Sequence, residues 1–398
     1  MRKLLWPVLV FAAVWPAWGL PEDCNAPASS PSITIDVPTH PFAAAPTRDG
    51  CWIFVSGTGG DSGKPGIAVL RRASGHVELV RMVALQPAGG FGMALTHDGK
   101  ILVATADASV AFFDVERLIS GQGDPLLGKF SDGRSPGSVY ANVTADDKLL
   151  FVSDEAQESI TVIDLPKARA NGYRDIAIIG RIPVGHAPIA LTFSPDGKSL
   201  YTTSEGALDE WHWPNACTPE GRGGDASISR PQGAVLVVDV ARAATDPAKS
   251  VVARIPAGCS PVRMAISPSG DRIYVTARNS NAVLSFDTAK LTSDPEHARL
   301  STVTVGAAPV PVAVIDGGRK VVAGNSNRFA GPREPQTLTV IDAAKMTEGQ
   351  AAILGTIRAG AFPREMAVSA DGRTLFLTNF SSQTLQVIDI GNLPLVHP

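Results

Sequence analysis

The sequence has few charged residues and no excess of either sign of charge. Asp, Glu, Lys and Arg make up 18% of the 398 residues, and 35 basic against 38 acidic side chains leave a formal net charge of −3. Charge of this density does not keep a chain disordered. The absence of a net basic field argues against nucleic acid as a partner. Hydrophobic residues make up 44%, which is enough to bury a core.

Long hydrophobic runs are confined to the first twenty residues. Residues 2–3 are basic, residues 4–18 are apolar but interrupted by two prolines, and small residues flank Trp18 before an expected cleavage after Gly19. A membrane-spanning helix needs about 20 apolar residues, so this segment is a poor anchor. We therefore expect residues 1–19 to be a signal peptide. The remaining chain, 20–398, is expected in the periplasm or outside the cell, with no membrane span.

Cysteine is scarce as well. The four cysteines are Cys24, Cys51, Cys217 and Cys259, and none of them forms a Cys-x-x-Cys pair. This excludes the usual redox, c-type haem and zinc-ribbon motifs. An even number of cysteines in an exported chain favours disulfide bonds, with four free thiols as the alternative.

Turn residues, by contrast, are abundant and recur at a fixed period. The chain has 38 glycines and 31 prolines, and an Asp-Gly-type turn returns seven times. These turns lie at residues 49–50, 98–99, 146–147, 196–197, 269–270, 317–318 and 371–372. The spacings between their second residues are 49, 48, 50, 73, 48 and 54. Short runs rich in Val, Ile, Leu, Phe and Tyr flank each turn, which is typical of β-strands in hairpins.

A repeat of about 50 residues with four strands predicts a blade of a β-propeller. Seven turns predict seven blades in one all-β domain over residues 20–398. The last repeat ends after its third strand, at Asp389, whereas residues 33–37 form an extra strand before the first repeat. We expect this N-terminal strand to complete the last blade, because ring closure removes two open sheet edges.

Several repeats carry the same short motifs. Leu200–Thr203, Ile273–Thr276 and Leu375–Asn379 resemble the Tyr-Val-Thr-Asn repeat of the YVTN-type propellers, and Thr161–Asp164 and Thr339–Asp342 match that family's second hallmark. The resemblance covers nearly the whole chain after the signal peptide. It implies a periplasmic or surface binding protein, with lactonases and amine dehydrogenase heavy chains as neighbouring families. No catalytic residue set can be carried over.

The expected topology pairs the cysteines. Strands A to D of a blade run outward from the axis, so D–A and B–C loops share one face and A–B and C–D loops share the other. Cys217 and Cys259 then lie on one face in adjacent blades, and Cys24 and Cys51 lie together on the opposite face. We predict the disulfides Cys24–Cys51 and Cys217–Cys259.

Two B–C loops exceed the repeat and rise on the face shared with the D–A loops. Residues 204–232 in blade four contain Trp211, His212 and Trp213, and residues 325–336 in blade six contain Arg328 and Phe329. Long loops with aromatic and arginine side chains are typical of binding surfaces. The alternative is a lid whose tryptophans only cover their own loop.

The starts of the innermost strands form a ring at the channel mouth. Aligned by their turns, the ring positions are Ala43, Gly92, Tyr140, Ala190, Arg263, Pro311 and Glu365. Arg263 and Glu365 are the only charged residues among them, Arg364 is adjacent, and His186 opens the loop of blade four. Charges in a small, apolar ring need partners. Arg263 and Glu365 either pair with each other, or Arg263 holds an anionic ligand.

Other chemistry has weaker support. His40, His186 and His212 could share one face with Asp209 or Glu210 as metal ligands, and Asp154-Glu155 could hold calcium. The glycine-rich segment 57–64 has no helix after it, as a phosphate loop requires, so it is interpreted as a hairpin loop. We expect neither a metal site nor a cofactor.

Three functions remain open. The preferred hypothesis is a non-catalytic, monomeric binding module for a small anionic ligand or a protein. In it Arg263 and Arg364 hold the anion, Glu365 orients them, and the long loops form a lid. A lactonase-like hydrolase is the second, with Glu365 or His186 as general base and Arg263 stabilising an oxyanion. The third is a cell-surface scaffold that binds another protein through its loops.

Overall fold

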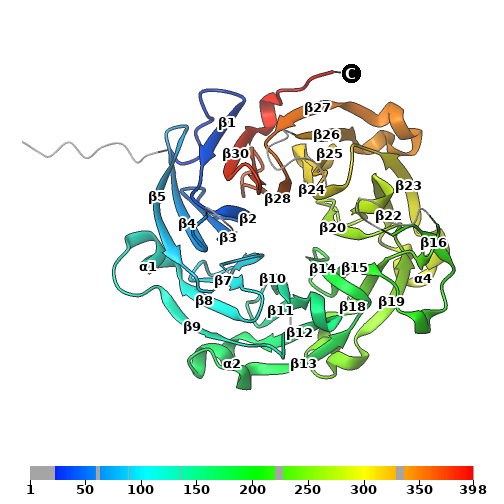
Figure 1. Ribbon diagram of the computed structural model, residues 1–398, viewed down its shortest axis with the longest axis horizontal. Coiled ribbons are helices and arrows are strands. Elements are labelled where there is room, and N and C mark those ends of the chain that lie inside the picture. The colour runs from blue at the N-terminus through cyan, green and yellow to red at the C-terminus, as the bar shows by residue number, and fades with distance from the viewer. Residues whose placement is uncertain are drawn as a thin grey trace, which may run out of the picture.

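The chain folds as a ring of four-stranded antiparallel sheets around a central axis (Figure 1). The computed structural model describes residues 23–59, 63–87, 89–135, 137–219, 227–328 and 336–397. Within these residues there are seven such sheets, so the predicted seven-bladed propeller is confirmed. The expected signal peptide, 1–19, lies outside the described residues.

Each blade consists of consecutive strands, apart from the last. The strands are, from blade one to blade seven, β2–β5 (His40–Pro46, Trp52–Thr58, Gly66–Ala73, His76–Ala84), β6–β9 (Met93–Leu95, Ile101–Thr105, Val110–Asp114, Leu126–Phe130), β10–β13 (Ser138–Val143, Leu149–Asp154, Ser159–Asp164, Ile178–Pro183), β14, β15, β18 and β19 (His186–Phe193, Ser199–Gly206, Ala234–Asp239, Val251–Pro256), β20–β23 (Pro261–Ile266, Arg272–Ala277, Ala282–Asp287, Arg299–Thr304), β24–β27 (Pro309–Ile315, Lys320–Asn325, Gln336–Asp342, Ile353–Ala359), and β28–β30 (Pro363–Val368, Thr374–Asn379, Thr384–Asp389) with β1 (Ser32–Asp36). The long loop of blade four adds a small hairpin, β16 (Asn215–Cys217) and β17 (Arg230–Pro231).

The N-terminal strand closes the ring as predicted. β1 pairs antiparallel with β30, from Ser32 opposite Ile388 to Asp36 opposite Thr384. The strand begins one residue earlier than the sequence indicates. The first and last parts of the chain therefore share blade seven, and β1 covers the edge that β30 would otherwise expose.

The Asp-Gly turns owe their recurrence to two local requirements. Gly50 and Gly99 have φ of +75° and +69°, a left-handed conformation that costs glycine little. The preceding aspartate accepts hydrogen bonds inside the turn: Asp49 Oδ1 accepts from the Cys51 N–H at 3.0 Å, and Asp98 Oδ1 accepts from the Lys100 N–H at 3.0 Å. The turn residues thus fix each A–B hairpin.

The aspartate that ends most third strands has a structural role that the sequence pattern alone does not explain. Asp114, Asp164 and Asp239 accept hydrogen bonds from backbone N–H groups three residues later, at 2.8–2.9 Å. They are the N-caps of short helices, α1 (Val115–Ser120), α2 (Leu165–Ala170) and α3 (Val240–Ala243); the further helix α4 (Lys290–Ser293) follows the third strand of blade five. The cap stops the strand and directs the chain outward to the fourth strand.

The hydrophobic core lies between the blades. One cluster joins Val103 and Phe112 of blade two to Leu150 and Ile163 of blade three, and comparable clusters join the other neighbouring pairs. Because both faces of a blade are covered by its neighbours, the strands are nearly continuous hydrophobic runs. The packing leaves the starts of the innermost strands around the axis, where the candidate site lies.

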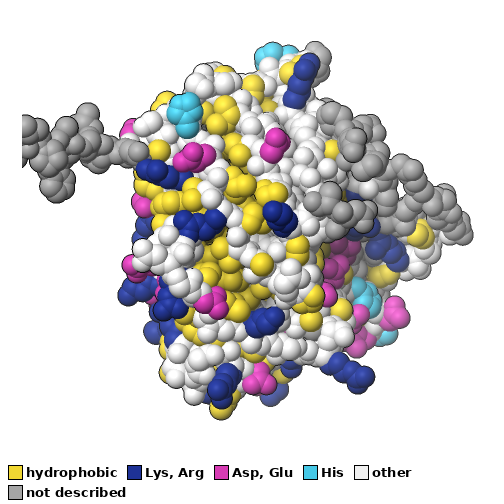
Figure 2. Space-filling model, turned by 60° about the vertical axis from the view of Figure 1, so that its left-hand side comes forward, with side chains coloured by type: hydrophobic (Ala, Val, Ile, Leu, Met, Phe, Trp, Pro, Cys, Tyr) yellow, Lys and Arg dark blue, Asp and Glu magenta, His cyan; other side chains and the backbone are white. Residues whose placement is uncertain are grey.

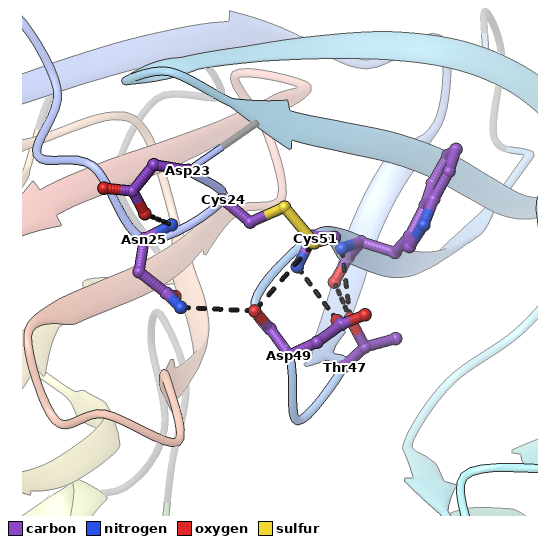
Figure 3. The surroundings of a disulfide bond; sticks show 7 residues. Asp23, Cys24, Asn25, Thr47, Asp49 and Cys51 are labelled. Carbon is purple, nitrogen blue, oxygen red and sulfur yellow. Dashed lines mark hydrogen bonds between the residues drawn. A yellow bond between two sulfur atoms is a disulfide. The ribbon is translucent and has the colours of Figure 1, made fainter. Parts of the chain in front are cut away.

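Both predicted disulfides are present. Cys24 is bonded to Cys51 with 4.7 Å between the Cα atoms, and Cys217 to Cys259 with 5.6 Å. Figure 3 shows the first bridge beside the A–B turn of blade one, where Asn25 Nδ2 also donates to the Asp49 carbonyl at 3.2 Å. This bridge fixes the segment that leads into β1, so it reinforces the closure of the ring.

The surface in Figure 2 carries basic and acidic side chains interspersed over an apolar background, with no continuous basic patch on that face. In the described part of the chain, no helix is long and apolar enough to span a membrane.

Candidate binding site at the channel mouth

The innermost strands start with a β-bulge at the channel mouth. The pairing register shifts between Ser138 and Tyr140 in β10, between Pro261 and Arg263 in β20, and between Pro363 and Glu365 in β28. A bulge bends a strand and redirects side chains. Here it recurs at the ring positions that the sequence alignment singled out.

Arg263 and Glu365 form an ion pair across the channel. Arg263 Nε donates to Glu365 Oε2 at 2.8 Å, with side chains only 4% and 13% exposed. The pair therefore ties blade five to blade seven. Its geometry matches the sequence-based alternative in which the two charges neutralise each other.

The rest of the Arg263 guanidinium is surrounded by rings. Its carbon lies 4.4 Å from the ring centre of Tyr140 and 5.9 Å from that of Phe42, and Nη1 and Nη2 are buried without a partner among the described residues. Burial and the Glu365 carboxylate raise the pKa of Tyr140, so its hydroxyl stays protonated. Burial alone would lower the pKa of Arg263, but Glu365 raises it, so the guanidinium remains charged.

Arg364 also lies against Phe42. Its guanidinium carbon is 4.1 Å from the Phe42 ring centre and 5.8 Å from that of Phe362. Burial and the charge of Arg263 lower the pKa of Arg364 to about 9. The nearby Glu365 carboxylate partly offsets this lowering. Among the described residues, no carboxylate contacts this half-buried arginine, which lies against aromatic faces instead.

A cavity of about 290 Å³ lies beside Phe42 and Arg364. Its aromatic lining is Phe42, Phe91, Phe362 and Phe380, and its charged lining is Glu155, Glu205, Arg278, Arg328 and Arg364. Arg278 binds Glu205 through two hydrogen bonds, of 2.9 and 2.7 Å. With three arginines against two glutamates, the cavity has an excess of positive charge and suits a ligand with an anionic group and an apolar body.

Not all predicted site residues meet here. Arg364 and Arg328 line the cavity. Arg263, Glu365 and Tyr140 are not in its lining, but they form a cluster next to Phe42, which is. His186 is exposed and binds Glu158 at 2.6 Å instead.

Trp211, His212 and Trp213 of the blade-four loop are not part of the cavity lining. Trp211 and Trp213 contact each other with tilted rings, their centres 5.3 Å apart, and pack on the core between blades three and four, while His212 is exposed. The Arg254 guanidinium lies over Trp211 at 5.2 Å. The tryptophans therefore cover their own part of the scaffold, as the alternative interpretation of this loop has it. Phe329 falls outside the described residues.

The histidines do not converge in the described part of the chain. No group of three or more His, Cys, Asp or Glu there is placed to hold a metal ion. His40 Nδ1 is 3.1 Å from the Phe380 carbonyl oxygen, and its Nε2 is 3.2 Å from Gln383 Nε2, so this ring is engaged in the scaffold.

Sequence reasoning missed the phenylalanines of the cavity lining and the Glu205–Arg278 pair. Phe42 stands one residue before a ring position, so extending the alignment by one residue would have found it. Glu205 is the second-last residue of β15 and Arg278 directly follows β21 in the adjacent blade, and only the three-dimensional packing shows that they meet.

Comparison with known proteins shows the fold and no more. No protein-family profile matches the chain, and no curated protein sequence matches it. Among solved structures, it is similar to a chain of the hydrazine synthase of Kuenenia stuttgartiensis, with 19% identity, a TM-score of 0.64 and coverage of 90% of this chain and 97% of that chain. At this identity the similarity supports a β-propeller.

Proposed function

We propose that the protein is an exported, non-catalytic binding module of the YVTN-type propeller group, and that its channel mouth binds a small molecule through an anionic group. The observation that carries the proposal is the environment of the Arg364 side chain. Its guanidinium lines a cavity of about 290 Å³ and, among the described residues, contacts rings and no carboxylate.

The neighbouring charges support this assignment. Arg263 is already neutralised by Glu365, and Arg278 by Glu205, so neither pair offers a full charge to a ligand. Arg364 does. An incoming carboxylate would form charge-assisted hydrogen bonds with it, and the phenylalanines would cover the ligand's apolar part.

The two disulfides and the sequence of the first nineteen residues support export. The lactonase-like alternative has less support, because Glu365 is held by Arg263 and His186 by Glu158. No feature of the described surface favours the scaffold alternative over a small-molecule site.

Isothermal titration with 3-phenylpropanoate as probe tests the proposal. We expect Arg364→Met to weaken binding about tenfold to a hundredfold, because a hydrogen bond to a charged group is worth about 1.5–3 kcal/mol. The matched control is Arg358→Met, on the exposed outer strand of a neighbouring blade. Equal affinity of the Arg364→Met variant and the wild type, or no binding of either this probe or L-phenylalanine to folded protein, would refute the site.

A further inference from the structure

We propose that the channel mouth binds a zwitterion with an aromatic or bulky apolar side group, of the α-amino acid class. This inference rests on the proposed function and names its ligand. Arg364 takes the carboxylate, Glu155 takes the ammonium group, and the phenylalanines take the side group.

Glu155 and Arg364 reach the same cavity from distant blades. Glu155 belongs to the B–C connection of blade three, in the short turn Glu155–Gln157, whereas Arg364 belongs to β28 in blade seven (Figure 1). Both charged side chains therefore line one cavity, although they belong to different blades. Among the described residues, neither side chain has an ion pair.

The other acidic side chain of the lining is not available to a ligand in the same way. Both carboxylate oxygens of Glu205 accept from Arg278, at 2.9 and 2.7 Å. Glu155 stands exposed at the rim without such a partner among the described residues. It is thus the lining carboxylate free to accept hydrogen bonds from an ammonium group.

The aromatic lining sets the ligand's third requirement. Phe42 and Phe91 contact edge to face with ring centres 5.2 Å apart, and Phe362 and Phe380 do so at 5.5 Å. These pairs present apolar ring surface to the cavity that also contains the two charges. A volume of about 290 Å³ suits a compact ligand, since pockets for drug-sized molecules begin near 300 Å³.

A simple carboxylate would satisfy only half of this arrangement. It would pair with Arg364 but place its apolar body near the Glu155 carboxylate, which would lose water without gaining a partner. An ammonium group on the carbon next to the carboxylate supplies that partner. The site would then prefer an amino acid to the corresponding desamino acid.

Three probes that differ by one group test the inference by isothermal titration at pH 7 and low salt. They are L-phenylalanine, 3-phenylpropanoate, which lacks the ammonium group, and 2-phenylethylamine, which lacks the carboxylate. We expect L-phenylalanine to bind at least tenfold more tightly than either analogue. Glu155→Gln should remove the advantage over 3-phenylpropanoate by weakening the binding of L-phenylalanine, and it should not weaken the binding of 3-phenylpropanoate. Glu116→Gln, on exposed α1, is the matched control.

The outcomes separate the two proposals. If 3-phenylpropanoate binds as tightly as L-phenylalanine and Glu155→Gln changes neither affinity, the zwitterion inference is wrong and the anion site stands. If Arg364→Met changes no affinity, or none of the probes binds the folded protein, the proposed function fails and the inference fails with it. Circular dichroism melts of each variant establish that it is folded.

Discussion

One buried position in blade three departs from its counterparts in other blades and can be tested by a single substitution. Asp154 ends β11 and pairs with Ser159, just as Asn325 ends β25 and pairs with Thr337. Asn325 Nδ2 donates to Thr337 Oγ1 and Thr339 Oγ1 at 2.9 and 3.0 Å, and its Oδ1 accepts from a backbone N–H. An amide at this position therefore satisfies both donors and acceptors.

In its ionised form, Asp154 has the acceptors but not the donor. Its carboxylate accepts from Thr161 Oγ1 at 2.5 Å and from Ser138 Oγ at 3.1 Å, and the Ser138 hydroxyl also lies 2.9 Å from Asp132 Oδ1. Both aspartates are fully buried. Burial and the charge of Asp132 raise the pKa of Asp154 to about 8, and burial raises the pKa of Asp132.

The raised pKa predicts a loss of stability with rising pH. Between the ordinary pKa of 3.8 and about 8, the folded protein binds a proton on Asp154 that the unfolded chain has released. The free energy of unfolding therefore falls as pH rises through this window, by up to about 1.4 kcal/mol per pH unit from this group, and levels off above it.

Asp154→Asn should remove this dependence. The amide does not titrate and provides the donor that Asn325 provides in blade six. We expect the variant to gain on the order of 1–3 kcal/mol at pH 8, where a buried charge without a full set of partners is removed. The same variant should show a smaller slope of stability between pH 5 and 8.

Urea unfolding at pH 5, 6, 7 and 8 measures both effects. Asp175→Asn, which changes the net charge equally at an exposed site, is the control and should show neither effect. A destabilised Asp154→Asn variant that keeps the wild-type pH slope would refute the reasoning.

Three further predictions concern the scaffold. Replacing both Cys24 and Cys51 by serine should lower the free energy of unfolding by about 3–4 kcal/mol, because the unfolded chain regains the entropy of a loop of this length. Amide hydrogen exchange should accelerate first in β1 and β30. Unchanged protection in these strands would contradict a role of the disulfide in ring closure. Arg263→Met should lower the free energy of urea unfolding by about 3–5 kcal/mol, because it leaves Glu365 buried without its partner. The double variant with Glu365→Met should recover most of this loss. An equal loss in the single and the double variant would contradict the prediction. Gly99→Ala should cost about 1 kcal/mol, because φ is +69° while no atom lies within 4 Å of the added Cβ; a neutral effect would show that the turn relaxes.

The fold could be predicted from the sequence because the pattern of one blade recurs seven times. The turn spacing gave the number of blades, and the missing last strand together with residues 33–37 gave the closure that β1 and β30 form. The disulfide pairing followed from topology alone, because each partner had to be on the same face as the other.

The candidate site could be predicted only in part. Alignment of the repeats placed Arg263 and Glu365 in one ring, since equivalent positions converge on the axis. It could not show that Arg263 and Arg364 both lie against the Phe42 ring, because such contacts depend on side-chain directions. The alignment of the repeats also could not predict that Trp211 packs on the core, because the repeat does not determine the path of the inserted loop.

The most direct test of the channel-mouth site is anomalous diffraction from crystals soaked with 4-bromo-L-phenylalanine. We expect a bromine peak inside the cavity lined by Phe42, Phe91, Phe362 and Phe380, with the ligand carboxylate at Arg364. A peak only elsewhere on the propeller, or no peak at a concentration that saturates binding in solution, would contradict it.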